Sequence, residues 1–166
     1  MEVRSVETIV KALNDAEVKY LIVGGLAVNA HGYERLTVDV DLVIGLQAEN
    51  IIRAFHALNA IDYHPSIPIT PEDFANSTLR ETWRKEKQML VLKLWSDAHR
   101  RTPIAVFVYE PFDFVREHAA AKWETVIGDV KAPVISYQTL LAMKHEAARD
   151  KDLLDIRALR KLDPYR

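Results

Sequence analysis

The spacing of hydrophobic residues in the first part of the chain predicts short buried strands between amphipathic helices. Apolar residues at helical spacing predict a helix around residues 6–13. An apolar run over Tyr20–Val23 predicts a buried strand that ends in a tight turn at Gly24 and Gly25. The pattern that follows predicts, in order, a short helix over 26–31, an alternating strand over 37–44 and an amphipathic helix over 47–58.

The second part of the chain continues this alternation after an irregular stretch. Three prolines between residues 63 and 75 predict a loop with a short helix near 71–74, and the polar segment 78–87 fits either a helix or a loop. The remaining pattern predicts strands over 89–95 and 104–108, a helix over 112–121, a hairpin over 125–134 that turns at Gly128-Asp129, and helices over 137–149 and 150–162. Ser136 is the expected N-cap of the first of these closing helices.

This order of elements predicts an α/β (α+β) fold in which helices flank a mixed, twisted sheet. The length of 166 residues favours a single domain over 1–166, with a core at about 1–134 and closing helices at about 136–162. Trp83 lies in the polar segment 78–87, where core packing is favoured over stacking on a nucleobase. Trp95 and Trp123 are expected to pack in the core or on the sheet.

Composition and charge exclude several classes of protein. Hydrophobic residues make up 49% of the chain, and the formal net charge of −2 indicates neither a bulk nucleic-acid coat protein nor a polybasic membrane anchor. The absence of cysteine excludes disulfides, a zinc knuckle and a thiol nucleophile. Apolar runs fall far short of the roughly 20 residues needed to cross a bilayer, so we expect a cytoplasmic protein without a membrane partner.

Asp39 and Asp41 are the first candidates for chemistry. Residues i and i+2 of a strand point to the same side and lie about 7 Å apart. Two carboxylates placed in this way can hold a divalent cation through hard oxygen ligands, with a nucleoside triphosphate supplying further oxygens. A lone Asp-x-Asp is more often a solvent-facing acidic strand, so both interpretations of the pair stay open.

Gly24 and Gly25 have a comparable pair of interpretations. A glycine pair after a buried strand often marks a tight turn and nothing more. Its functional interpretation is that glycine lets the backbone approach a phosphate closely, while the start of the following helix offers N–H donors. Neither motif decides the function alone, and the informative feature is their combination in one segment.

Residues 21–44, LIVGGLAVNAHGYERLTVDVDLVI, resemble the signature of nucleotidyltransferases of the DNA-polymerase-β superfamily. In that family an apolar strand ends in Gly-Gly or Gly-Ser, and an apolar–Asp–apolar–Asp/Glu–apolar strand follows after a dozen or so residues. Thirteen residues separate Gly25 from Asp39 here. The Arg35-x-Thr37-x-Asp39-x-Asp41 ending is similar to the bacterial AbiEii-like and toxin–antitoxin branch.

The resemblance implies a metal-dependent transfer reaction. Gly24 and Gly25 would cradle the triphosphate of an NTP, and Asp39 and Asp41 would bind Mg²⁺ or Mn²⁺. A nucleotidyl group would pass in line to an acceptor, and pyrophosphate would leave. The acceptor stays open between an RNA end, a protein and a small molecule.

A late motif extends the resemblance toward the end of the chain. The helix that contains Lys144, followed by Arg149, Asp152 and Asp155, is similar to a motif of the AbiEii-like branch. By this resemblance Lys144 would neutralise triphosphate oxygens, and Asp152 would orient or activate the acceptor. The alternative is a pair of surface helices with ordinary salt bridges, such as Lys151 with Asp155 at i,i+4.

One position departs from the family's pattern. Most members carry a third carboxylate on a later strand, and the matching position here is Ala105. Either another acid replaces it, with Glu110 and Asp152 as candidates, or the protein is a catalytically weak nucleotide-binding module that acts through a protein partner. The sequence leaves both alternatives open.

Overall fold

The computed structural model describes residues 1–166 as a seven-stranded mixed sheet with eight helices. The α/β class and the mixed sheet expected from the sequence are therefore confirmed. The strands are β1 (Tyr20–Val23), β2 (Val40–Ile44), β3 (His64–Pro65), β4 (Val91–Trp95), β5 (Ile104–Phe107), β6 (Lys122–Ile127) and β7 (Val130–Val134). The helices are α1 (Val3–Asp15), α2 (Gly24–Ala30), α3 (Ala48–Ala60), α4 (Pro71–Ala75), α5 (Ser77–Glu86), α6 (Phe114–Ala120), α7 (Tyr137–Ala147) and α8 (Asp150–Leu162).

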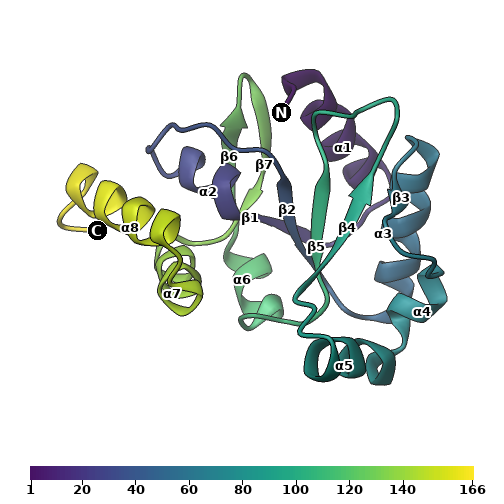
Figure 1. The fold of residues 1–166 in the computed structure, drawn as a ribbon. Helices are drawn as coiled ribbons and strands as arrows, with labels where there is room; N and C mark the ends of the chain where they lie inside the picture. The colour runs from purple at the N-terminus through teal and green to yellow at the C-terminus, as the bar shows by residue number, and fades with distance from the viewer.

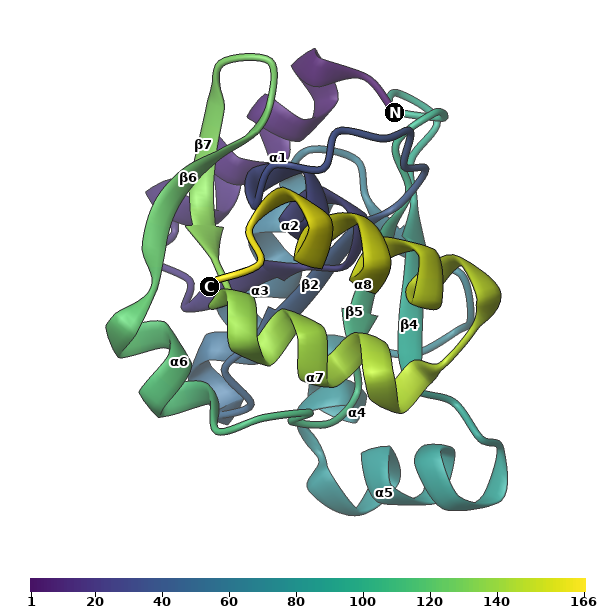
Figure 2. The ribbon, with the colours of Figure 1, turned by 90° about the vertical axis from the view of Figure 1, so that its left-hand side faces the viewer.

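The strands run in the order β3-β4-β5-β2-β1-β7-β6, so β2 and β1 lie near the middle of the sheet. β2 pairs antiparallel with β1 and parallel with β5, whereas β7 pairs parallel with β1. α1 and α3 pack against each other on one side of the sheet, and α7 and α8 lie on the other (Figure 1). In Figure 2, α7 and α8 cross in front of the strands that carry the candidate site.

Local sequence explains most element boundaries. β1 is buried along its whole length, which its uninterrupted apolar run requires. Thr70 caps α4 in a capping box with Asp73, and the Ser136 hydroxyl accepts a hydrogen bond from the Thr139 N–H at 3.2 Å at the start of α7. The hairpin of β6 and β7 turns at Gly128-Asp129, and Gly128 has a φ of +53° that suits glycine.

The segment between α2 and β2 differs from the expected strand over 37–44. β2 begins at Val40, and Asp39 lies just before it, because β1 ends at Val23, whose partner across the sheet is Asp41. Without a neighbouring β1 residue the preceding chain leaves the sheet, so Leu36 and Val38 are 98% and 68% exposed.

Two further details differ from the sequence prediction, and the tryptophan positions resolve an alternative that it left open. α2 begins at Gly24 rather than at residue 26, and the short strand β3 was not predicted. Of the two alternatives expected for Trp95 and Trp123, the structure has them on sheet strands β4 and β6, about half exposed, and not in the core, whereas Trp83 is buried against Phe74 as expected. No helix has the length and apolar character needed to cross a membrane.

Candidate active site

The turn from β1 into α2 leaves no space for a side chain. Gly24 has a φ of +63°, and a Cβ at this position would lie 2.1 Å from Oδ2 of Asp41. A Cβ on Gly25 would lie 2.2 Å from Oγ1 of Thr37. Both contacts are far shorter than atoms tolerate, so glycine at both positions is what lets the Asp41 carboxylate lie against the backbone of the turn.

Asp41 belongs to a row of side chains that crosses four strands on one face of the sheet. Asp41 is the register partner of Val23 on β1 and of Ala105 on β5, and Ala105 is also the partner of Lys93 on β4. Register partners point to the same face of a sheet. The Ala105 side chain therefore faces the same side as Asp41, next to which the sequence comparison expected a third acid.

The negative charges of the two candidate metal-binding carboxylates are compensated to different extents. Asp39 forms an ion pair with Lys93, and both side chains are partly exposed. Asp41 has no ion pair or side-chain hydrogen bond within the chain. Burial, together with the nearby charge of Asp39, raises the pKa of Asp41 to about 6, although Lys93 and Lys144 oppose the shift. Asp41 thus carries a charge that the protein leaves largely uncompensated.

A cavity of about 800 Å³ opens beside this row of side chains. The structure brings every predicted site residue to its wall: Gly24, Gly25, Asp39, Asp41, Ala105, Lys144 and Asp152. Glu110 does not line the cavity; its carboxylate accepts a hydrogen bond from the Phe114 N–H at 2.7 Å, at the start of α6. It is therefore badly placed to substitute for the missing third acid.

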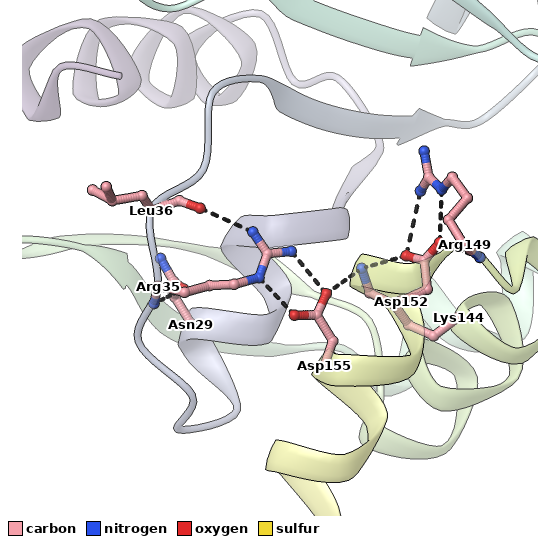
Figure 3. A network of polar contacts seen from close by, with 7 residues as sticks. All are labelled: Asn29, Arg35, Leu36, Lys144, Arg149, Asp152 and Asp155. Atoms are coloured by element: carbon pink, nitrogen blue, oxygen red, sulfur yellow. Dashed lines mark hydrogen bonds and ion pairs between the residues drawn. The ribbon is translucent and has the colours of Figure 1, made fainter.

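The late motif forms a buried ion network that Figure 3 shows in full. The Lys144 Nζ lies 3.0 Å from Asp152 Oδ1 and 2.8 Å from Asp155 Oδ2. The Arg35 guanidinium donates to both Asp155 oxygens, from Nε at 2.6 Å and from its second terminal nitrogen at 2.8 Å. Arg149 Nε donates to Asp152 Oδ2 at 2.7 Å. Three cations thus enclose two carboxylates that are each only 1% exposed.

The network sets the protonation of both acids. Burial alone would raise their pKa values. Hydrogen bonds from Arg149 and Lys144 nevertheless hold the pKa of Asp152 below its usual value, and those from Arg35 and Lys144 do the same for the pKa of Asp155. Both aspartates are therefore ionised, and their oxygens already accept hydrogen bonds from cations of the chain.

The predicted ion pair between Lys151 and Asp155 does not form, because Arg35 and Lys144 occupy both Asp155 oxygens. Lys151 instead lines the cavity, is exposed and has no ion pair. Its charge is near enough to oppose the raised pKa of Asp41. Lys151 is thus a cavity residue that the sequence interpretation assigned to an ordinary surface pair.

Another part of the cavity wall carries aromatic side chains. Phe107 and Tyr109 continue from Ala105 at spacings of two residues, and their ring centroids lie 5.8 Å apart. The Arg84 guanidinium stacks on Tyr109, 4.0 Å from the ring centroid. Glu146 also lines the cavity and has no ion pair. Sequence reasoning missed this wall because Arg84 is one more charge on a polar helix and reaches the cavity only through the packing of α5.

The carboxylate pair fits a divalent cation in part. Asp39 and Asp41 supply hard oxygen ligands, and the uncompensated charge of Asp41 is what such an ion would satisfy. No group of three or more His, Cys, Asp or Glu side chains converges anywhere in the chain. A cation at this position would therefore depend on a bound substrate for most of its ligands.

Comparison with solved structures places this arrangement on a known fold. The solution structure of the antibiotic-resistance factor ANT(2'')-Ia matches with a TM-score of 0.64 at 14% identity, covering 96% of this chain and 82% of that one. A crystal structure of ANT(2'')-Ia in complex with adenylyl-2''-tobramycin gives a TM-score of 0.58.

Two further proteins match over nearly the whole chain. The lincosamide antibiotic adenylyltransferase LnuA, in its lincomycin-bound structure, has a TM-score of 0.58 at 15% identity, with 96% of this chain and 97% of that one covered. An antigenic nucleotidyltransferase-like protein from Paracoccidioides brasiliensis has a TM-score of 0.55 at 19% identity, with coverages of 97% and 76%. No protein-family profile and no curated protein sequence matches the chain. The chain therefore has the fold of these nucleotidyltransferases.

Proposed function

We propose that this protein transfers a nucleotidyl group from a nucleoside triphosphate to the hydroxyl of a small molecule. One observation carries the proposal: the Gly24-Gly25 turn and the carboxylates of Asp39 and Asp41 meet at the wall of one cavity, on a fold shared with nucleotidyltransferases. The close contact between Gly24 and Asp41 allows a triphosphate to approach the backbone and the acids at once.

Asp39 and Asp41 are the residues that would hold Mg²⁺ or Mn²⁺. Such an ion, when bound, balances the negative charge of the transferring and leaving phosphate oxygens. The chain's own part is to fix the two carboxylates beside the glycine turn, where phosphate oxygens complete the ligand set. We therefore expect metal and nucleotide to bind together rather than separately.

The positive charge for the triphosphate comes from the late motif. The Lys144 ammonium has three N–H donors, of which two are used by Asp152 and Asp155, and the third is free for a phosphate oxygen. Lys151 lines the same wall with no partner of its own. Asp152 acts in this scheme as a positioning residue that holds Lys144 and Arg149 at the cavity. This motif, with the Arg35-x-Thr37-x-Asp39-x-Asp41 segment, also supports placement in the AbiEii-like, toxin–antitoxin-type branch.

The reaction forms a bond between the acceptor oxygen and the α-phosphorus and breaks the bond from that phosphorus to the bridging oxygen, so pyrophosphate leaves. The acceptor hydroxyl must lose its proton. We assign the proton to Glu146, because Asp152 is held ionised by two cations and is a weak base for that reason. Glu146 lines the cavity and has no partner.

The shape of the cavity favours a small molecule over the other acceptors. Its volume of about 800 Å³ falls in the range of small-ligand sites, and the Phe107 and Tyr109 rings offer an aromatic surface on its wall. The lincomycin and adenylyl-tobramycin complexes of the structural neighbours are further support. An RNA end or a protein side chain remains as the alternative outcome of the acceptor assay below.

A second function follows from Ala105. With a methyl group next to Asp41 and no further acid there, the site has the features of a catalytically weak nucleotide-binding module that acts through a protein partner. Both functions require nucleotide binding, and only the first requires turnover.

Release of pyrophosphate from each NTP, with a panel of small-molecule acceptors, tests the transferase. We expect release that requires Mg²⁺ or Mn²⁺ and is lost in Asp41→Asn and strongly reduced in Glu146→Gln. Nucleotide binding without release under any acceptor, including total RNA and cell lysate, would support the binding module. Absence of nucleotide binding with and without metal would rule out both.

A further inference from the structure

Lys93 occupies a special place in the row of side chains that crosses the sheet. It lies opposite Ala105 on β4, and Ala105 lies opposite Asp41 on β2. Only the methyl group of Ala105 therefore stands between the Lys93 strand position and Asp41 on this face. The Lys93 side chain thus lies beside the carboxylate pair, in space that an acidic side chain at position 105 would partly occupy.

The Lys93 side chain reaches across this methyl group to the other carboxylate. Its Nζ forms an ion pair with Asp39 Oδ2, and the two side chains are 47% and 30% exposed. Lys93 and Asp39 both line the cavity, so the pair faces the ligand space rather than the core. Asp39 is consequently neutralised from within the chain, while Asp41 is not.

We propose that Lys93 is a built-in cation that restricts the Asp39/Asp41 pair to a single divalent ion and contacts the phosphates of the nucleotide. The proposal rests on the nucleotidyl-transfer function and specifies how its site is charged. Sites with two divalent ions place them about 3.5–4 Å apart and need several carboxylates to hold both. This site has two acids and an ammonium in contact with one of them.

The ammonium has two consequences. It competes with a divalent ion for Asp39, which weakens metal binding in the absence of nucleotide. When an ion draws Asp39 away, the Lys93 ammonium is left at the cavity wall, where its three N–H donors suit phosphate oxygens. Lys93 thus balances charge that an additional metal ion would otherwise balance.

Titration with Mn²⁺ alone, followed by electron paramagnetic resonance of the free ion, tests the competition. Lys93→Met keeps an unbranched side chain of similar length and removes its charge, and we expect it to bind Mn²⁺ about tenfold more tightly than the wild type, a change of about 1.4 kcal/mol. Lys93→Arg keeps the charge and should bind as the wild type does. Lys131→Met, at an exposed lysine of β7 outside the cavity, is the matched control and should have no effect.

The number of ions is measured with Mn²⁺ and the non-hydrolysable analogue α,β-methylene-ATP. We expect one Mn²⁺ per wild-type chain and two per chain in the double variant Lys93→Met/Ala105→Asp, which exchanges the ammonium for a third carboxylate. Lys93→Met alone provides the decisive comparison if the buried aspartate of the double variant prevents folding, which a thermal melt detects.

Two results would overturn the assignment of Lys93: two Mn²⁺ ions in the wild type, or an unchanged or weaker Mn²⁺ affinity in Lys93→Met. A different result bears on the function as a whole. If neither Mn²⁺ nor the analogue binds to any variant, the nucleotidyl-transfer site itself is wrong, and the role of Lys93 is overturned with it.

Discussion

Asp39 and Asp41 beside β1 differ from Asp152 and Asp155 on α8 in how their negative charge is balanced. The first pair meets one lysine, Lys93, and Asp41 has no partner at all. Burial, together with the charge of Asp39, raises the pKa of Asp41 to about 6. The second pair is enclosed by cations and has lowered pKa values.

This difference in charge balance distinguishes a candidate binding site from an ion network that stabilises the fold. Both pairs consist of closely spaced acids in a short segment, so sequence spacing treats them alike. An acid pair that the fold has already neutralised has no charge to offer to a metal ion. An acid pair that the fold leaves uncompensated is held ready for a cation from outside.

The largest expected loss of stability follows from replacing Lys144, which pairs with both Asp152 and Asp155. Lys144→Met leaves two buried carboxylates facing each other, and removal of one partner from a buried ion pair costs about 3–5 kcal/mol. Unfolding in urea should detect this loss directly. Lys151→Met, at an exposed and unpaired lysine of the same cavity, should change stability by no more than about 0.5 kcal/mol. Similar losses in the two variants would mean that the network around Lys144 does not stabilise the fold.

Asp155→Asn is expected to reduce the unfolding free energy by about 1.5–3 kcal/mol, the usual worth of a hydrogen bond to a charged group. Because the folded pKa of Asp155 is lowered, its stabilisation is present above the unfolded pKa and is lost as the pH falls. The difference in unfolding free energy between the wild type and the variant should therefore shrink as the pH falls. Denaturant titrations at pH 7 and at pH 3 measure this, and a gap that is as large at pH 3 as at pH 7 would contradict it.

Asp41→Asn should change the free energy of unfolding in the opposite direction to Asp155→Asn. The folded pKa of Asp41 is raised from 3.8 to about 6, so the folded state binds more protons than the unfolded state between these values. Stability of the wild type therefore falls as the pH rises through this window. The variant should be more stable than the wild type by on the order of 2 kcal/mol at pH 7.5 and show no gain near pH 3.5. Asp15→Asn, at an exposed acid of α1, is the control and should follow the wild type.

Gly24→Ala should lower the free energy of unfolding by about 1–2 kcal/mol, because alanine is strained at the positive φ of this position. The new methyl group would nevertheless displace the Asp41 carboxylate from the turn. Metal-dependent nucleotide binding, measured by calorimetry well below the melting temperature of the variant, should then be lost although the chain is still folded. Retained binding would show that the close contact between turn and carboxylate is not needed.

The sequence was most informative where its signal is local. The strand that ends at Gly24-Gly25 and the nearby Asp41 follow from an apolar run, two glycines and a spacing, and all of these lie within one short segment. Ala105, the position where the resemblance expects a third carboxylate, also lies opposite Asp41, because strand alternation fixes the face once the register is known.

The missed features depend on contacts that no local rule contains. Lys93 reaches Asp39 only because β4 pairs with β5 in one particular register. The i,i+4 rule suggested Lys151 as the partner of Asp155, but Lys144, on the preceding helix, and Arg35 reach that acid instead. Ion pairs with buried partners stabilise a buried carboxylate more than an ion pair with an exposed lysine does. Asp155 therefore pairs with residues that tertiary packing brings to it and not with its neighbour on the same helix.

The contact between Arg35 and Asp155 also has a consequence for synthesis of the chain. The two residues are 120 positions apart, and the loop that carries Arg35 leads directly into Asp39. While the protein is being translated, the Arg35 guanidinium cannot pair with Asp155 until α8 has left the ribosome. Synthesis would thus delay completion of the site until α8 docks, so products that end before α8 would carry the early motif without a finished site.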